Sequence, residues 1–141
     1  MVEYSPAPSA ILSGTDIDLL RDSDLIQINA GALAEQFVGQ ELMAYGEPYR
    51  KTKLFFWTRE KPGSEAEIDY LIQYKSNMIP IEVKAGKSSR IRSMRLFMEE
   101  TKAPMGIRIS QNPLKFDPDI LSIPLYMISE IPRLLEEVRA R

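Results

Sequence analysis

The distribution of apolar positions divides the chain into helix-like and strand-like stretches. Residues 30–45 carry Ala34, Phe37, Val38, Leu42 and Tyr45 at helical spacing, which predicts the first helix. A second helix is expected to begin at a serine cap near position 88 or 89 and to run to about residue 102. A closing helix is expected over residues 131–141, with a proline in its first turn.

Extended apolar segments predict the strands between these helices. The expected strands cover residues 54–59, 67–74, 78–85, 105–110 and 123–128. The sequence therefore predicts an α/β domain over residues 30–141, with a mixed central sheet of four to five strands flanked by helices in the order α-β-β-β-α-β. Residues 1–29 are interpreted as an N-terminal arm, a remnant of a neighbouring domain, with one or two helical turns over 17–25.

Composition agrees with one small domain. With 141 residues, 44% of them hydrophobic, the chain can bury a single core. There is no cysteine, which excludes disulfides and thiolate metal sites and fits a reducing compartment. No run of 18 apolar residues and no secretory leader is found, so a cytoplasmic protein without a membrane span is expected.

The third expected strand carries two charged residues where apolar ones are the norm. Glu82 and Lys84 are two positions apart and therefore share one face of a strand, while Ile79, Ile81 and Val83 line the other. A solvated strand face with alternating charges is the ordinary explanation of this pattern. The alternative is a functional site, and the position of a third residue, Asp69, decides between the two.

The register of the hairpin places Asp69. A turn centred on Ser76 and Asn77 puts Asp69 opposite Lys84, so that Asp69, Glu82 and Lys84 face one side of the sheet. Asp69 and Glu82 are then diagonal neighbours, roughly 7 to 8 Å apart at the backbone. A loop of odd length would send Asp69 to the opposite face and abolish the site.

Two carboxylates and a lysine suit divalent-metal chemistry. Mg²⁺ prefers oxygen ligands and keeps several waters, so Asp69 and Glu82 together with substrate phosphate oxygens could hold Mg²⁺ or Mn²⁺. The metal would polarise a phosphodiester, and Lys84 would either orient a water or stabilise charge in the transition state. The residues alone leave both roles of Lys84 open.

At these residues the chain resembles the PD-(D/E)xK, or restriction-endonuclease-like, nuclease superfamily. Asp69 stands at the aspartate of the motif and residues 82–84 at its (D/E)xK, with Ile68 in the place of the proline. More closely, segments 31–42, 56–59, 67–70 and 81–84 resemble the uncharacterised nuclease-like domain at the C-terminus of prokaryotic AAA-type ATPases. The resemblance implies a restriction-endonuclease-like core and adds an acid from the first helix. Glu35 is assigned to that role, with Glu41 as the alternative.

Basic residues after the third strand are candidates for binding a phosphate backbone. The net charge of the chain is only −2, yet Lys87, Arg90, Arg92 and Arg95 follow Lys84 with no acid between them. A solvated helix face explains the same pattern. Residues 86–88 imitate the end of a nucleotide-binding loop, but the required glycine is replaced by Ile81, so no ATPase activity is expected.

These observations lead to two hypotheses of different classes. One is a metal-dependent nuclease acting on nucleic acid through Glu35, Asp69, Glu82 and Lys84. The other is a non-catalytic module of the same fold that docks a partner protein or nucleic acid, as the C-terminal domain of an AAA-type ATPase. The sequence does not predict the oligomeric state.

Overall fold

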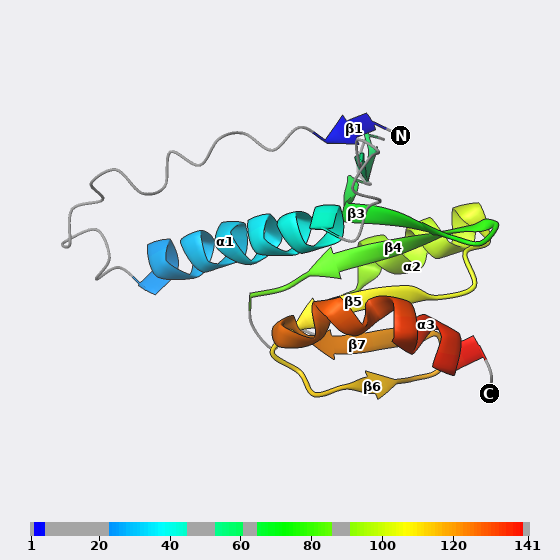
Figure 1. Ribbon diagram of the computed structural model, residues 1–141. Helices are drawn as coiled ribbons and strands as arrows, with labels where there is room; N and C mark the ends of the chain where they lie inside the picture. Colours follow the sequence, from blue (N-terminus) through cyan, green and yellow to red (C-terminus); the bar gives the residue numbers. More distant parts are fainter. Residues whose placement is uncertain (1, 5–22, 45–52, 61–64, 86–90, 140–141) are drawn as a thin grey trace.

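The computed structural model describes residues 2–4, 23–44, 53–60, 65–85 and 91–139 (Figure 1). The elements, in chain order, are β1 (Val2–Tyr4), α1 (Ser23–Ala44), β2 (Leu54–Arg59), β3 (Ala66–Tyr74), β4 (Asn77–Val83), α2 (Arg92–Thr101), β5 (Gly106–Ser110), β6 (Lys115–Phe116), β7 (Ile120–Pro124), the 3₁₀ helix η3 (Leu125–Glu130) and α3 (Ile131–Arg139). The order from α1 to β5 is the predicted α-β-β-β-α-β succession.

The strands form one mixed sheet in the order β1-β2-β3-β4-β5-β7-β6. Strands β1 to β4 are antiparallel neighbours, β5 and β7 run parallel to β4, and β6 is antiparallel to β7. The predicted α/β class with a mixed, helix-flanked sheet is confirmed. The sheet has seven strands within the described residues rather than four to five, because β1 and β6 are too short to produce a periodic pattern.

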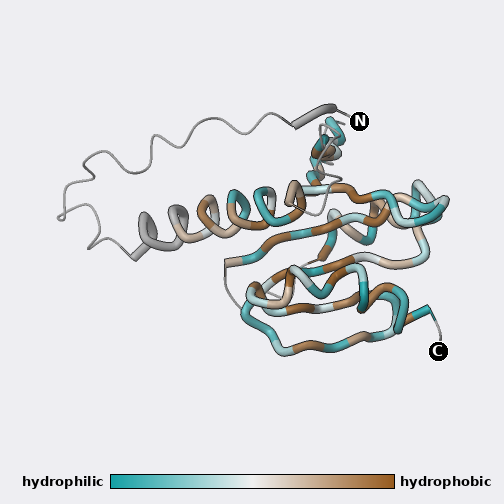
Figure 2. The backbone as a smooth tube through the Cα atoms, in the orientation of Figure 1, coloured by the Kyte–Doolittle hydropathy of each residue, from teal (hydrophilic) through white to brown (hydrophobic). Residues whose placement is uncertain are grey.

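Helices cover both faces of the sheet, and each face has its own apolar core. On one face α1 and α3 pack over β4, β5 and β7; Val38, Ile107 and Leu135 belong to this core. On the other face α2 packs over β3, where Met94 and Phe97 contact Ile68. Figure 1 shows α2 and α3 on opposite sides, and Figure 2 shows hydrophobic stretches along the central strands. Burial on both faces agrees with the strand burial, since β7 is buried at every position and β5 at every position except Arg108.

The last predicted strand, residues 123–128, is wrong in its second half. The strand β7 covers residues 120–124 and ends at Pro124, after which the chain forms η3. Ile123 and Ile128 are both buried, so the apolar spacing alone could not separate a strand from a 3₁₀ turn. The neighbouring β6 lies in the stretch that was expected to be a loop.

The first helix is longer than predicted. It begins at Ser23 rather than near residue 30, and so crosses the boundary drawn between arm and domain. Residues 2–4 of the proposed arm pair with β2 at the edge of the sheet, while residues 5–22 lie outside the described part. Neither α1 nor any other described helix is long and apolar enough to cross a membrane.

Candidate functional site

A β-bulge determines where Asp69 points. The pairing of β2 with β3 shifts between Phe55 and Trp57, so Asp69 and Tyr70 of β3 together lie opposite one residue of β2. The Asp69 Oδ2 atom accepts a hydrogen bond of 2.6 Å from the backbone N–H of Val83. The carboxylate of Asp69 is therefore turned toward the end of β4.

Glu82 and Lys84 form an ion pair at that end of β4. The Lys84 Nζ lies 2.9 Å from Oε1 of Glu82. Glu82 is only 6% exposed, and its second oxygen, Oε2, is buried without a hydrogen-bond partner. Lys84 directly follows β4, and its N–H donates to the carbonyl of Ile109, which continues the parallel pairing with β5 and keeps both charged residues on one face.

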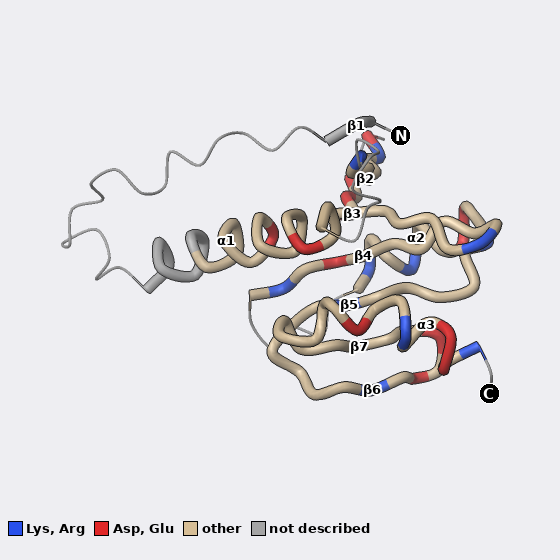
Figure 3. Tube along the Cα trace, in the orientation of Figure 1, with Lys and Arg blue, Asp and Glu red and all other residues tan. Residues whose placement is uncertain are grey.

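Helix α1 approaches β3 at Glu35, beside Asp69. The Tyr70 hydroxyl donates a hydrogen bond of 2.8 Å to the backbone carbonyl of Glu35. One turn further along, a Cβ atom on Gly39 would lie 2.8 Å from that hydroxyl, so only glycine lets the helix approach β3 this closely. In Figure 3 acidic positions of α1 lie next to the acidic and basic positions at the end of β4.

Burial and neighbouring charges shift the pKa values of Asp69, Glu35 and Lys84. Burial raises the pKa of Asp69 from 3.8 to about 7; the hydrogen bond from Val83 opposes the shift, and the charge of Glu35 adds to it. Loss of water also raises the pKa of Glu35, partly offset by Lys84. Burial lowers the pKa of Lys84, but the hydrogen bond and charge of Glu82 outweigh it, so that the net shift is upward. Lys84 therefore stays an ammonium ion at neutral pH.

The hairpin register differs from the prediction by two residues. Tyr74 pairs with Asn77, so the loop is Lys75 and Ser76, and Lys75 adopts a left-handed φ of 56°. Tyr70 pairs with Ile81, which places Asp69 beside Glu82 and Val83 rather than opposite Lys84. A shift of two preserves the alternation of faces, and for this reason the predicted residues still converge.

The arrangement of the acids fits a cation held by two carboxylates. The unpartnered Glu82 Oε2 and the partly buried Asp69 carboxyl, with its raised pKa, both gain from a positive charge between them. Oxygen donors of this kind suit Mg²⁺ or Mn²⁺, which need only one or two protein carboxylates. In the described part of the chain, no three acidic side chains are grouped closely enough to hold a metal by themselves.

Of the two acids predicted on the first helix, Glu35 is the one whose charge acts on the candidate site. Glu35 is among the groups that shift the pKa values of both Asp69 and Lys84, and Glu41 is not. Glu67, which the sequence interpretation did not single out, also acts on Glu35. Glu67 lines a groove of about 770 Å³ between β2, β3 and the start of α2. Its two-residue spacing from Asp69 was the signal that could have identified it.

The basic residues proposed for nucleic-acid binding are only partly described. Lys87 and Arg90 lie outside the described residues, as do the two serines proposed as helix caps. Arg92 is exposed at the start of α2, whose N-cap residue is Ile91. The Arg95 guanidinium is 2.6 Å from the carboxylate of Asp119. In the part of the chain that the structure describes, Arg92 is thus an exposed cation, whereas Arg95 is engaged by Asp119.

Comparison with known proteins places the chain in a family. A family model described as "Domain of unknown function (DUF4143)" matches residues 30–127. The chain belongs to this family. The DUF4143 match covers most of α1 and the whole succession from β2 to β7, including all four residues of the candidate site. No curated protein and no solved structure matches the chain.

Proposed function

We propose that this DUF4143 chain is a metal-dependent phosphodiesterase of the PD-(D/E)xK type that acts on nucleic acid. The observation that carries the proposal is the convergence of Asp69, Glu82 and Lys84, with Glu35, on one end of β4. The α-β-β-β-α-β order is the one expected for a restriction-endonuclease-like core. Asp69 and Glu82 would hold Mg²⁺ or Mn²⁺.

The cost of burying these acids supports this function. A buried carboxylate with an unpartnered oxygen, such as Glu82, lowers the stability of a fold unless something compensates it. Asp69 is in a similar position, since burial alone pushes its pKa toward neutrality. Strongly shifted groups of this kind concentrate at functional sites.

The residues of the chain suggest how the reaction would proceed. A bound Mg²⁺ would polarise the scissile phosphate and lower the pKa of a nearby water. Lys84 is held in place by Glu82, and because its pKa is raised it serves as a hydrogen-bond donor to developing negative charge rather than as a general base. Glu35, with a raised pKa and a place at the edge of the site, is the candidate to exchange a proton with the attacking water.

Titration with Mn²⁺ tests the metal site. We expect wild type to bind Mn²⁺ in calorimetry and the Asp69→Asn variant to lose that binding. Asp117→Asn is the matched control, because this aspartate is an exposed partner of Lys115 on β6. Equal Mn²⁺ binding by wild type and Asp69→Asn would contradict the proposed ligand.

A cleavage assay tests the chemistry. Wild type is expected to cut single-stranded or duplex DNA or RNA with Mn²⁺ present, and Lys84→Ala to lose this activity by about a hundredfold or more. If purified protein cuts none of these substrates, and Lys84→Ala behaves as wild type, the proposed activity is wrong.

One observation favours the second hypothesis, a non-catalytic docking module, as in the C-terminal domain of an AAA-type ATPase. Leu33 and Phe37 lie one turn apart on α1 and are 48% and 42% exposed. Exposed apolar side chains on one helix face are typical of a protein-binding surface. A docking module would be indifferent to Mn²⁺ and to Asp69→Asn, so the same titration separates the two functions.

A further inference from the structure

A polar row crosses the sheet beside the candidate site. Glu82 of β4 pairs with Arg108 of β5, which pairs in turn with Ser122 of β7. Residues paired across strands share a face, so these three side chains lie on the face that carries α2. Helix α2 covers the start of β5, since a Cβ atom on Gly106 would lie 2.4 Å from the Met94 sulfur. Arg108 follows two residues later on the same face.

Arg108 is an arginine without a carboxylate partner among the described residues. Its Nη2 donates a hydrogen bond of 2.7 Å to the Ser122 hydroxyl, and its Nε is buried without a partner. Glu82, its neighbour on β4, is bound to Lys84 instead. A guanidinium is always charged at neutral pH, so the row contains a cation with donors left for an anion.

We propose that Arg108 and Ser122 form a subsite for a nucleic-acid phosphate adjacent to the one that is cleaved. This inference rests on the proposed function, in which the reacting phosphate lies at the end of β4. Arg108 is on the neighbouring strand β5, about 4.8 Å away in the plane of the sheet. The fork of an arginine matches two oxygens of a phosphate, and the Ser122 hydroxyl fixes the orientation of that fork. Arg108 is a positioning residue in this scheme.

The side chains around Arg108 favour a phosphate over a carboxylate of the protein. Lys84 stands at the far side of Glu82 and adds a second positive charge to the same face. Ser110, two residues beyond Arg108, is buried and accepts hydrogen bonds from Asn112, so the end of β5 is polar as well. The ends of β4 and β5 thus carry two cations, Lys84 and Arg108, of which only Lys84 is paired with Glu82.

Binding of a labelled single-stranded oligodeoxynucleotide in EDTA tests the subsite without metal or cleavage. Fluorescence anisotropy should show that Arg108→Gln weakens binding roughly tenfold and lowers the slope of log K against log salt by about one. Arg133→Gln is the matched control, because Arg133 lies on α3, over the opposite face. It should match wild type, and equal affinities and salt slopes for the two variants would overturn the subsite.

Two conservative variants keep the test decisive if Arg108→Gln does not fold. Arg108→Lys retains the charge and should keep the wild-type salt slope while losing several-fold in affinity, because the fork is gone. Ser122→Ala should lose less, with no change in slope. Wild-type affinity in both folded variants would also overturn the inference.

Mn²⁺ titration of the same proteins separates this inference from the proposed function. Arg108→Gln should bind Mn²⁺ as wild type does, because Arg108 is not a metal ligand. If wild type binds Mn²⁺ and Arg108→Gln binds the oligonucleotide as tightly as wild type, only the subsite is rejected. If wild type binds no Mn²⁺ but Arg108→Gln binds the oligonucleotide more weakly than wild type, the nuclease is rejected and the phosphate subsite is supported.

Discussion

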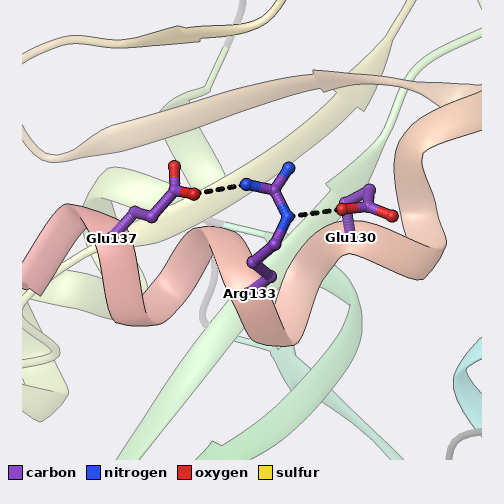
Figure 4. Close-up of polar contacts among 3 residues, drawn as sticks. All are labelled: Glu130, Arg133 and Glu137. Atoms are coloured by element: carbon purple, nitrogen blue, oxygen red, sulfur yellow. Dashed lines mark hydrogen bonds and ion pairs between the residues drawn. The ribbon is translucent and has the colours of Figure 1, made fainter.

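Two ion-pair regions of this molecule have opposite characters. At the junction of η3 and α3, Arg133 bridges Glu130 and Glu137 on the surface (Figure 4). All three side chains are at least two-fifths exposed, and the partners are three and four residues apart in one helical stretch. At the end of β4, the buried Glu82 pairs with the half-buried Lys84.

The two regions differ in what their charges gain from folding. The Arg133 cluster keeps its water and forms local pairs, which contribute little to stability and weaken with salt. Glu82 has lost its water, yet one of its oxygens has no partner. Breaking such a pair is costly, whereas an apolar replacement of the whole pair is often neutral. The surface cluster therefore costs little to form and needs no functional explanation, whereas the pair that includes the buried Glu82 calls for one.

The pH dependence of stability gives the largest expected effect. Asp69 binds its proton with a pKa of about 7 in the fold and 3.8 when unfolded, so between these values the native state holds more protons. The free energy of unfolding should therefore fall by up to roughly 4 kcal/mol as the pH rises from 4 to 8 without metal. Urea denaturation at several pH values measures this slope.

The Asp69→Asn variant sharpens the same comparison. It lacks the titrating group, so its stability should change much less over this pH range. Added Mn²⁺ should stabilise wild type more at pH 8 than at pH 6, because the metal competes with the proton on Asp69. A wild-type slope that survives in Asp69→Asn would assign the effect to another group.

Removing the half-buried Lys84 ammonium, which pairs with the buried Glu82, should have the next largest effect. Lys84→Met leaves Glu82 buried and unpaired, and should lower the free energy of unfolding by about 3 kcal/mol. Lys115→Met is the matched control, because Lys115 pairs with Asp117 on the surface and should show little change in a urea titration. Similar losses in both variants would erase the distinction between buried and exposed pairs.

A smaller effect is expected where α1 meets β3. In Gly39→Ala the new methyl group would collide with the Tyr70 hydroxyl, and we expect a loss of about 1 to 2 kcal/mol. Gly31→Ala serves as the control, since a Cβ there has open space. Thermal unfolding measures both variants, and an unperturbed Gly39→Ala would mean that the helix can move away freely.

The smallest effect should come from the surface cluster. Arg133→Gln removes the common partner of Glu130 and Glu137 and should leave the urea midpoint unchanged at high salt. A clear destabilisation that persists in high salt would show that the exposed cluster is as important as the buried pair.

The sequence predicted local elements and the alternation of faces better than the pairing of distant residues. The bounds of β2 and the C-terminal end of α2 agree with the prediction, because each element shows one regular spacing of apolar residues along its length. The hairpin turn was misplaced by one residue, which changes the register by two, since Lys75 adopts a left-handed conformation that its side chain does not signal. Alternation survived that error, and so did the grouping of Asp69, Glu82 and Lys84.

Other features could not be predicted because they depend on tertiary contacts. The bulge at Asp69 is defined by pairing with β2, and no residue type in β3 predicts it. Arg108 acquires its neighbours through parallel pairing with Glu82 and Ser122, which are distant in the sequence. Its position between Ile107 and Ile109 in a predicted strand is the one sign of it in the sequence.

The hydrogen bond from Val83 to Asp69 gives the site a built-in reporter. The Val83 amide proton is bound to the carboxylate whose charge changes near neutral pH. Its NMR chemical shift should follow that change, and its exchange with deuterium should quicken when the carboxylate is neutralised and the bond weakens. One backbone resonance thus allows the ionisation of the buried acid to be followed without substrate, label or mutation.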